Sequence, residues 1–375
     1  MKQPVILSVI VLLLAATLVL SACSGNAGQP TVIQATESQP TESRPKAGVE
    51  GTVWVADEEG NSITVIDAAT NQVLTTLTGI EGAHNIQVAP DGKTVWAVSG
   101  HDALAVMIDA STYKVHGVVS TGMEPAHIIL SPDGKTAYAT NGADNTLSVI
   151  DVGTMTTTAT IPVGESPHGQ RSSPDGRWVY VANIKSNSLS VIDTQSNTKV
   201  ADIEVGDRPV QVGFSPDGEF LYFSLNGENA LGKLDIATRE LVGKVSVGVG
   251  PIQVFVTPDN KYVLVAKQGT ADNTSTTVSI VDVATFTVAA TLETGKGAHG
   301  VVVDSSSRYA YITNIYENTV SVIDIEQKVV IATVPSGAAP NGISFSAQPA
   351  VPAPSPEVQL EIPEAVLMDM PEMTP

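Results

Sequence analysis

One unit of about 42 residues recurs along most of this 375-residue chain, and this regularity limits the possible folds more than any other feature. In each copy an aspartate ends an alternating apolar stretch, usually as Ile-Asp. These aspartates stand 42 residues apart, with one interval of 47, at Asp67, Asp109, Asp151, Asp193, Asp235, Asp282 and Asp324. Seven copies of one structural unit are therefore predicted, with a single insertion of five residues.

Each copy reads as four short strands. In one copy, four runs rich in Val, Ile, Thr and Tyr are separated by turn residues such as Pro-Asp-Gly, at 126–131, 136–140, 146–151 and 157–161. Four antiparallel strands in about 40 to 45 residues, repeated radially, are typical of a β-propeller blade. Leucine-rich and helical repeats need other periodicities, and the Trp-Asp signature of WD repeats is absent at this period.

Three copies share a string of Tyr, two residues and Asn, at Tyr138–Asn141, Tyr180–Asn183 and Tyr311–Asn314. The first two copies carry Trp54 and Trp96 in the Tyr position, which keeps a large ring to fill the space between blades. These strings resemble the YVTN family of β-propeller repeats over residues 50–346. The resemblance implies an all-β, seven-bladed propeller with four antiparallel strands in each blade.

The phase of the repeat predicts how the ring closes. In the YVTN family the innermost strand, strand a, precedes the Pro-Asp-Gly turn. The chain would then open with strands b, c and d of blade one at 52–78 and end with strand a of the same blade at 341–346. We therefore expect 28 strands, with blade one assembled from both ends of the repeat region, which removes exposed sheet edges.

The N-terminal residues 1–22 are typical of an export signal, because Lys2 precedes an apolar run from Val5 to Leu20. The run leads to Leu-Ser-Ala-Cys, which resembles the bacterial lipobox and implies lipidation of Cys23, the only cysteine. The alternative is an ordinary export signal with a chance cysteine. Residues 23–49, rich in Ser, Thr, Gln and Pro, then read as a disordered tether. We expect a lipid-anchored protein of the cell envelope, on the outer membrane if the host has one and otherwise on the outer face of the plasma membrane.

The C-terminal residues 347–375 contain seven prolines, five acidic residues and no lysine or arginine, so we expect a disordered tail. Met368, Met370 and Met373 lie within six residues of one another. Thioethers at that density can bind Cu(I). The alternatives are a docking motif for a partner and no function.

The net charge of the chain favours some classes of binding partner over others. The chain has 19 basic and 39 acidic residues, a formal charge of −20, which repels polyanions over most of the surface. Nucleic-acid binding, known in a few YVTN proteins, is therefore disfavoured. A protein or a small molecule is the expected partner, and a monomer is the expected state.

Alignment on strand a predicts where a site could form. One column at the mouth of the central channel contains three histidines, in His84, Ala126, His168, Val210, Ile252, His299 and Asn341. His127 falls in the next column. Converging imidazoles could bind a transition-metal ion or the axial face of a macrocycle. The alternative is that Pro-His-Gly merely caps the inner strand. Because the three copies are not adjacent, we expect a wide polar rim and not a tight cage.

Two cations complete the candidate set of His84, His127, His168, Arg171, Lys267, His299 and Asn341. Arg171 lies in the string Gln170-Arg171-Ser172, which replaces the apolar Ile-x-Val of the other inner strands. With His168 it could hold an anion, or it could pair locally or face channel water. Lys267 stands in the Asn position of the motif and begins the longest loop, residues 268–277, beside the same mouth.

Three functions remain open from the sequence. The sequence favours a non-catalytic scaffold that binds a protein or a small ligand at this face, because no catalytic motif is recognisable. A second follows from resemblance to the haem-binding propeller of dissimilatory nitrite reductases, with His84, His168, His299 and Arg171 as candidates for haem or metal binding. The third is a hydrolase like the propeller lactonases, with Arg171 and a histidine base.

Overall fold

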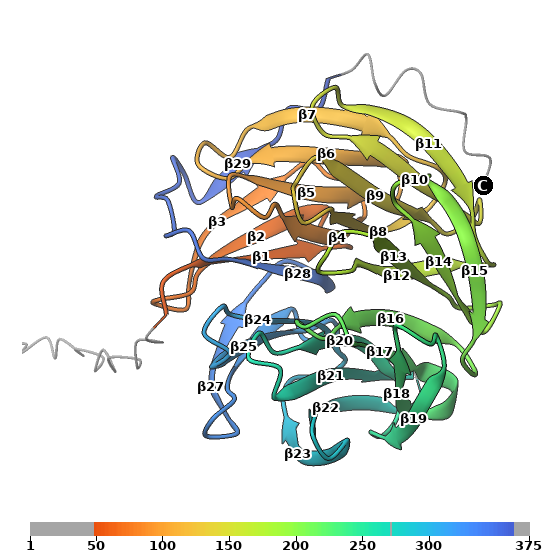
Figure 1. Ribbon diagram of the computed structural model, residues 1–375. Coiled ribbons are helices and arrows are strands. Elements are labelled where there is room, and N and C mark those ends of the chain that lie inside the picture. The colour runs from red at the N-terminus through yellow and green to blue at the C-terminus, as the bar shows by residue number, and fades with distance from the viewer. Residues whose placement is uncertain (1–48, 271, 364–375) are drawn as a thin grey trace, which may run out of the picture. The chain divides into compact units, whose positions relative to one another are not determined.

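The computed structural model describes residues 49–270 and 272–363, which form strands β1–β29 and one short 3-10 helix, η1 (Asn226–Glu228). The strands make seven radially arranged sheets (Figure 1). The prediction of an all-β propeller with seven blades of four antiparallel strands is confirmed, and one blade carries an additional fifth strand. Within the described part of the chain, no helix has the length and apolar character needed to span a membrane.

The innermost strand of each blade lines the central channel. These seven strands are β4 (Ala83–Val88), β8 (Pro125–Leu130), β12 (Pro167–Ser172), β16 (Pro209–Phe214), β20 (Pro251–Val256), β24 (Ala298–Val303) and β28 (Pro340–Ser346). Each lies against the inner strands of the two neighbouring blades, and β28 lies against both β24 and β4. The ring is therefore closed.

The remaining strands follow outward in chain order. Blade one has β1 (Thr52–Asp57), β2 (Ser62–Asp67) and β3 (Gln72–Thr78); blade two has β5 (Thr94–Ser99), β6 (Leu104–Asp109) and β7 (Val115–Ser120); blade three has β9 (Thr136–Asn141), β10 (Thr146–Asp151) and β11 (Thr156–Pro162); blade four has β13 (Trp178–Asn183), β14 (Ser188–Asp193) and β15 (Thr198–Glu204). Blade five has β17 (Phe220–Leu225), β18 (Ala230–Asp235) and β19 (Leu241–Ser246); blade six has β21 (Tyr262–Gly269), β22 (Thr274–Asp282) and β23 (Thr287–Glu293); blade seven has β25 (Tyr309–Asn314), β26 (Thr319–Asp324) and β27 (Val329–Pro335).

Blade one joins the two ends of the repeat region, as the phase of the repeat predicts. Strand β28 pairs antiparallel with β1, with Val53 opposite Phe345 and Trp54 opposite Ser344. Figure 1 shows β28, in blue, beside β1, in red. The sheet thus links residues nearly 300 positions apart, and β28 covers the inner edge of β1.

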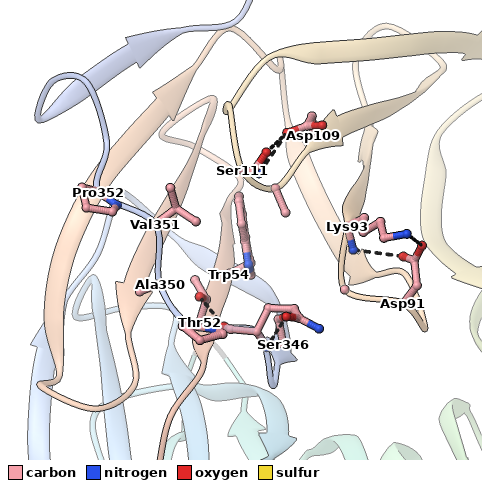
Figure 2. Close-up of a pocket in the computed structure, with 14 residues that line it drawn as sticks. Thr52, Trp54, Asp91, Lys93, Asp109, Ser111, Ser346, Ala350, Val351 and Pro352 are labelled. Carbon is pink, nitrogen blue, oxygen red and sulfur yellow. Dashed lines mark hydrogen bonds and ion pairs between the residues drawn. The ribbon is translucent and has the colours of Figure 1, made fainter.

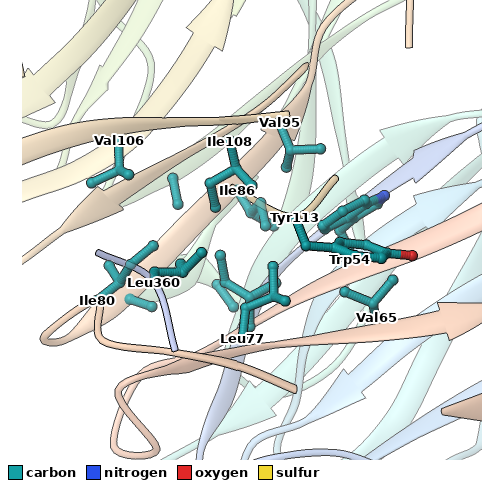
Figure 3. Close-up of a cluster of buried hydrophobic side chains, with 14 of the residues drawn as sticks. Trp54, Val65, Leu77, Ile80, Ile86, Val95, Val106, Ile108, Tyr113 and Leu360 are labelled. Carbon is teal, nitrogen blue, oxygen red and sulfur yellow. The ribbon is translucent and has the colours of Figure 1, made fainter. Parts of the chain in front are cut away.

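Large rings fill the space between blades. Trp54 and Tyr113 are buried with ring centroids 5.8 Å apart, in a cluster shared by blades one and two (Figure 3). Trp96, Tyr180 and Tyr311 are buried in the equivalent position of their own blades. Because the inner three strands of a blade pack on neighbours on both faces, their side chains are buried without polar alternation.

The recurrent aspartates of the Ile-Asp pairs are turn residues. The Asp151 carboxylate accepts hydrogen bonds from the backbone N–H and the hydroxyl of Thr154, and Asp109 is held in the same way by Ser111 and Thr112. These contacts fix the turn between the third and fourth strands. The sevenfold set of acids is therefore structural.

Every inner strand contains the same β-bulge. The pairing with the second strand skips two residues, for example between Pro125 and Ile128 in β8 and between Pro167 and Gln170 in β12. The other inner strands repeat the shift. A bulge bends the strand and redirects the side chains of the unpaired residues. In each blade this places two successive residues at one end of the channel.

The C-terminal segment corrects the prediction of a disordered tail. Residues 357–359 form β29 (Glu357–Gln359), which pairs in parallel with the outer strand β3, and Leu360 is buried in the cluster of Figure 3. Apolar Val358, Leu360 and Ile362 alternate with polar residues, a strand pattern that the proline content concealed. Met368, Met370 and Met373 lie outside the described residues, as do Cys23 and residues 1–22, for which an export signal is predicted.

Candidate metal centre

Three histidines from three consecutive blades converge at the channel mouth. His84 on β4, His127 on β8 and His168 on β12 each occupy a bulge position, and one ring nitrogen of each lies within 4.8 Å of the others. The Nε2 atoms of His84 and His168 are 3.3 Å apart, and the rings of His127 and His168 have centroids 4.7 Å apart. We call these three residues the imidazole cluster.

The expected wide rim is therefore wrong for these residues. His84 and His168 belong to blades that are not adjacent, but their imidazoles meet across the channel. His127, from the blade between them, completes the cluster because the bulge directs the second unpaired residue of β8 to the same end of the channel. The strand-a column alone did not predict this third member.

Glu58 orients one imidazole of the cluster. It follows β1 directly, and its Oε1 lies 3.0 Å from Nδ1 of His84. The Asn341 amide donates to its other oxygen at 2.7 Å. Burial acts to raise the pKa of Glu58, but the hydrogen bond and the charge of His84 outweigh burial and, with Asn341, hold the pKa at about 2. A carboxylate on Nδ1 leaves Nε2 of His84 as the nitrogen with a free lone pair.

The sequence did not point to Glu58 as a site residue, because the candidate site was sought by aligning strand a. The b-to-c loop carried the signal. At the position of Glu58 the other copies have Gly100, Gly142, Ile184, Asn226, Gln268 and Ile315, so an acid occurs in this copy alone.

His127 and His168 are held as neutral imidazoles. His127 is fully buried, and burial together with the charges of His168 and His84 lowers its pKa well below the usual value. Burial and the charges of His84 and His299 lower the pKa of His168 to about 3. Among the described residues, Nε2 of His127 and Nδ1 of His168 have no hydrogen-bond partner. Neutral rings with unpartnered nitrogens are suited to metal coordination.

His299 lies near the cluster but outside it. It is buried on β24, and burial with the charge of His84 lowers its pKa to about 4. Its Nδ1 also has no hydrogen-bond partner within the described segments. His299 therefore adds another neutral imidazole to the surroundings, and Asn341 acts on the cluster through Glu58.

Lys267 is a structural cation. Its Nζ is buried and donates to the carbonyl of Val247 at 2.9 Å, and burial lowers its pKa. In other blades the same position is occupied by an asparagine such as Asn141, which accepts from the backbone of the preceding loop. The structure thus gives Lys267 the loop-fixing role of that asparagine and does not bring it to the imidazole cluster.

Arg171 lies farther along the channel, toward the Pro-Asp-Gly end. It belongs to a set of residues at one position of the seven inner strands, which we call the lower ring: Gln87, Ile129, Arg171, Gly213, Phe255, Val302 and Ser344. Its charge contributes to the lowered pKa of His127. The structure therefore separates Arg171 from His168 along the channel axis.

A cavity of about 520 Å³ lies elsewhere, where the C-terminal segment crosses blade one (Figure 2). Its charged residues already have partners. Lys93 pairs with Asp91 at 3.7 Å, and Asp109 accepts hydrogen bonds from Ser111 and Thr112. This cavity offers no free charge to a ligand, so the channel remains the stronger candidate.

Comparison with known proteins places the chain among propellers. The family model described as YNCE-like beta-propeller matches residues 95–350. A search of curated proteins found no match. The solved structure of hydrazine synthase from Kuenenia stuttgartiensis is 26% identical, with a TM-score of 0.66, and the match covers 71% of this chain and 90% of that one.

Two further solved structures share the fold at 15% identity. Dihydro-heme d1 dehydrogenase NirN in complex with DHE has a TM-score of 0.60, with 80% of this chain and 77% of that one covered. A 6-phosphogluconolactonase candidate from Bacteroides uniformis has a TM-score of 0.67, with 79% and 99% covered. At this identity the likeness establishes the fold alone.

Proposed function

Because this chain belongs to the YNCE-like β-propeller family, whose fold prescribes no particular chemistry, we propose a function from its site: binding of one transition-metal ion by His84, His127 and His168. The observation that carries the proposal is the convergence of three ring nitrogens within 4.8 Å of one another. His127 is fully buried, His84 and His168 are half-buried, and His84 is oriented by a carboxylate.

The spacing of the nitrogens suits a tetrahedral ion. Two ligands of such an ion, each at about 2.0–2.1 Å, stand roughly 3.3 Å from each other. The Nε2 atoms of His84 and His168 are 3.3 Å apart. The third nitrogen, on His127, lies within 4.8 Å of both. Three imidazoles favour Zn²⁺, Cu²⁺ or Ni²⁺, and they leave a fourth position for water or an external ligand.

The geometry fits a single ion better than haem. A macrocycle bound axially by one histidine needs a flat space over that imidazole. Here the imidazoles of the cluster contact one another, so a macrocycle would have to separate them. We therefore do not propose haem binding, although the name of one structural neighbour, dihydro-heme d1 dehydrogenase NirN, includes a haem.

The proposed setting is the cell envelope. The lipobox-like Leu-Ser-Ala-Cys would anchor the mature protein to a membrane through Cys23, and the propeller would serve as a non-catalytic scaffold for a protein or small-molecule partner. Metabolic labelling with palmitate tests the anchor. The wild-type chain should incorporate label and remain with membranes, whereas Cys23→Ser should incorporate none. Equal labelling of both chains would contradict the anchor.

Titration of the chelator-treated protein with Zn²⁺ and Ni²⁺ tests metal binding. We expect one ion per chain, and at least about a 100-fold weaker affinity for His168→Ala, because removing one of three ligands leaves an incomplete shell. His116→Ala, at an exposed position on β7, is the matched control and should bind as the wild type does. Unchanged affinity in a variant lacking all three imidazoles would exclude the site.

Glu58→Gln tests the orienting carboxylate. Loss of the carboxylate charge that contacts Nδ1 of His84 should weaken metal affinity by about 10- to 100-fold, while the stoichiometry should stay at one ion per chain. The neighbouring Glu59 is exposed, so Glu59→Gln reports the general effect of removing one negative charge. Isothermal titration of both variants at equal ionic strength measures the difference. An equal loss in the two variants would assign the effect to net charge and not to orientation.

A further inference from the structure

The lower ring contains one charge without a counter-charge. Arg171 donates from Nη1 to the carbonyl of Gln170 at 3.0 Å. Across residues 49–270 and 272–363, no carboxylate oxygen lies within 4.0 Å of its guanidinium. Burial lowers its pKa to about 10. The side chain is half-buried, and a cation in this state lacks the charged partner that usually compensates the partial loss of water.

The Pro-Asp-Gly carboxylates of this blade and of the preceding blade are engaged in their own turns. Asp133 accepts from the hydroxyl of Ser131 at 2.6 Å and from the backbone N–H of Lys135. Asp175 accepts from the backbone N–H of Arg177, and the hydroxyl of Ser173 donates to it. Asp133 and Asp175 therefore do not supply the missing partner of Arg171.

A cavity lies in front of the guanidinium. It has a volume of about 330 Å³ and adjoins a second space of about 200 Å³ that is also lined by Arg171. Ile129, Phe255 and Val302 give it apolar walls, and Gly213 places no side chain beside the cation. A cavity of this size and composition is typical of sites for small organic molecules.

We propose that the lower ring binds a small organic monoanion, a carboxylate with a compact apolar body. The guanidinium would hold the carboxylate through paired N–H donors, and the apolar walls would contact the rest of the molecule. One unpaired cation selects one negative charge. The site stands apart from the imidazole cluster along the channel, and it does not depend on the bound metal.

Comparison of the repeats indicates how Arg171 affects the stability of its blade. Three other inner strands have Ile129, Phe255 and Val302 at this position, so the blade accepts an apolar side chain there. Replacing an unpaired, half-buried charge with an apolar residue of similar length removes the cost of its partial desolvation. Arg171→Met should therefore raise the Tm of the ligand-free protein. A structural role for Arg171 would give the opposite result.

The binding experiment uses benzoate, phenylacetate and hexanoate, each paired with its neutral amide. Chelator-treated protein should bind at least one acid at least about 10-fold more tightly than its amide, and Arg171→Met should lose that preference. Arg177→Met, an exposed arginine on the same blade, is the control and should keep it. Calorimetric titration and the ligand-induced change in Tm measure both effects.

Three results would overturn the proposal. One is equal binding of every acid and its amide. Another is competition by inorganic phosphate at the same concentration as the organic acids, which would mean that the apolar walls add nothing. The last is a lower Tm for ligand-free Arg171→Met than for the wild type, which would make the arginine a structural residue.

Discussion

A chain that ends at Ala339 should fail to form the closed propeller. It lacks β28 (Pro340–Ser346), which pairs with β1 and contacts both neighbouring inner strands, β24 and β4. Its loss would expose the inner edge of blade one and the apolar side chains on both of its faces. We expect loss of the cooperative thermal transition, because the expected cost exceeds the usual total stability of about 5–15 kcal/mol.

Two longer chains are the controls for this truncation. A chain that ends at Pro363 keeps all 29 strands and should melt as the full chain does. A chain that ends at Ser346 loses β29, the buried Leu360 and hydrogen bonds such as that from the Tyr113 hydroxyl to the Val351 carbonyl. It keeps the closed ring, so its Tm should fall by a smaller amount; burial of the leucine alone contributes on the order of 2 kcal/mol. Circular dichroism and hydrogen exchange of β1 measure the effects. A cooperative transition at the wild-type Tm in the shortest chain would contradict the role of β28.

The Asp57→Asn substitution should stabilise the protein at alkaline pH. Asp57 ends β1 at a position where three other blades have Asn141, Asn183 and Asn314. Each asparagine accepts from a loop glycine N–H and donates to two hydroxyls, as Asn141 does with Gly122, Thr146 and Ser148. Asp57 is fully buried, and its Oδ1 has no hydrogen-bond partner among the described residues. An amide should therefore fit this position better than a carboxylate.

The pH dependence of Asp57 has a definite sign. Burial raises its pKa from 3.8 to about 7, although the hydroxyls of Thr64 and Ser62 oppose the rise. Between these pH values the folded state keeps a proton that the unfolded state has lost, so stability falls as pH rises from about 4 to 7. The full penalty, on the order of 4 kcal/mol, is present above pH 7. Asp57→Asn should remove it.

Urea unfolding at several pH values checks this prediction. The stability gained by Asp57→Asn should be near zero at pH 4 and should grow to several kcal/mol at pH 8. Asp91→Asn changes an exposed aspartate that pairs with Lys93, so the same comparison should give only a small difference. A stability difference for Asp57→Asn that does not change with pH would mean that the carboxyl is not buried as a proton-binding group.

The fold could be predicted from the sequence because a propeller repeats one four-stranded unit. The spacing of the Ile-Asp aspartates predicts the number of blades, and the phase of Pro-Asp-Gly predicts the pairing of β28 with β1. Both signals are periodic, so errors in one copy are corrected by the others. The C-terminal strand β29 has no second copy, and its prolines pointed to disorder instead.

The site was predictable only in part, for a geometric reason. The strand-a column placed His84 and His168 at the channel mouth. However, it grouped them with His299 and predicted a wide rim in which their side chains do not meet. The inclusion of His127 depends on the bulge in β8, and the role of Glu58 depends on a loop that approaches β4 from another blade. Neither distance across the channel nor a bulge position can be read from the period of a repeat.

The bulge in every inner strand also bears on how this architecture can change. At each bulge two successive residues lie outside the main-chain ladder, so their identity is uncoupled from the pairing that stabilises the blade. Duplication of the repeat would therefore have produced seven equivalent dipeptide positions around one channel mouth. Each of these dipeptides could mutate without unfolding its blade. Exchanging such dipeptides between copies offers a route to new ligand chemistries on an unaltered scaffold.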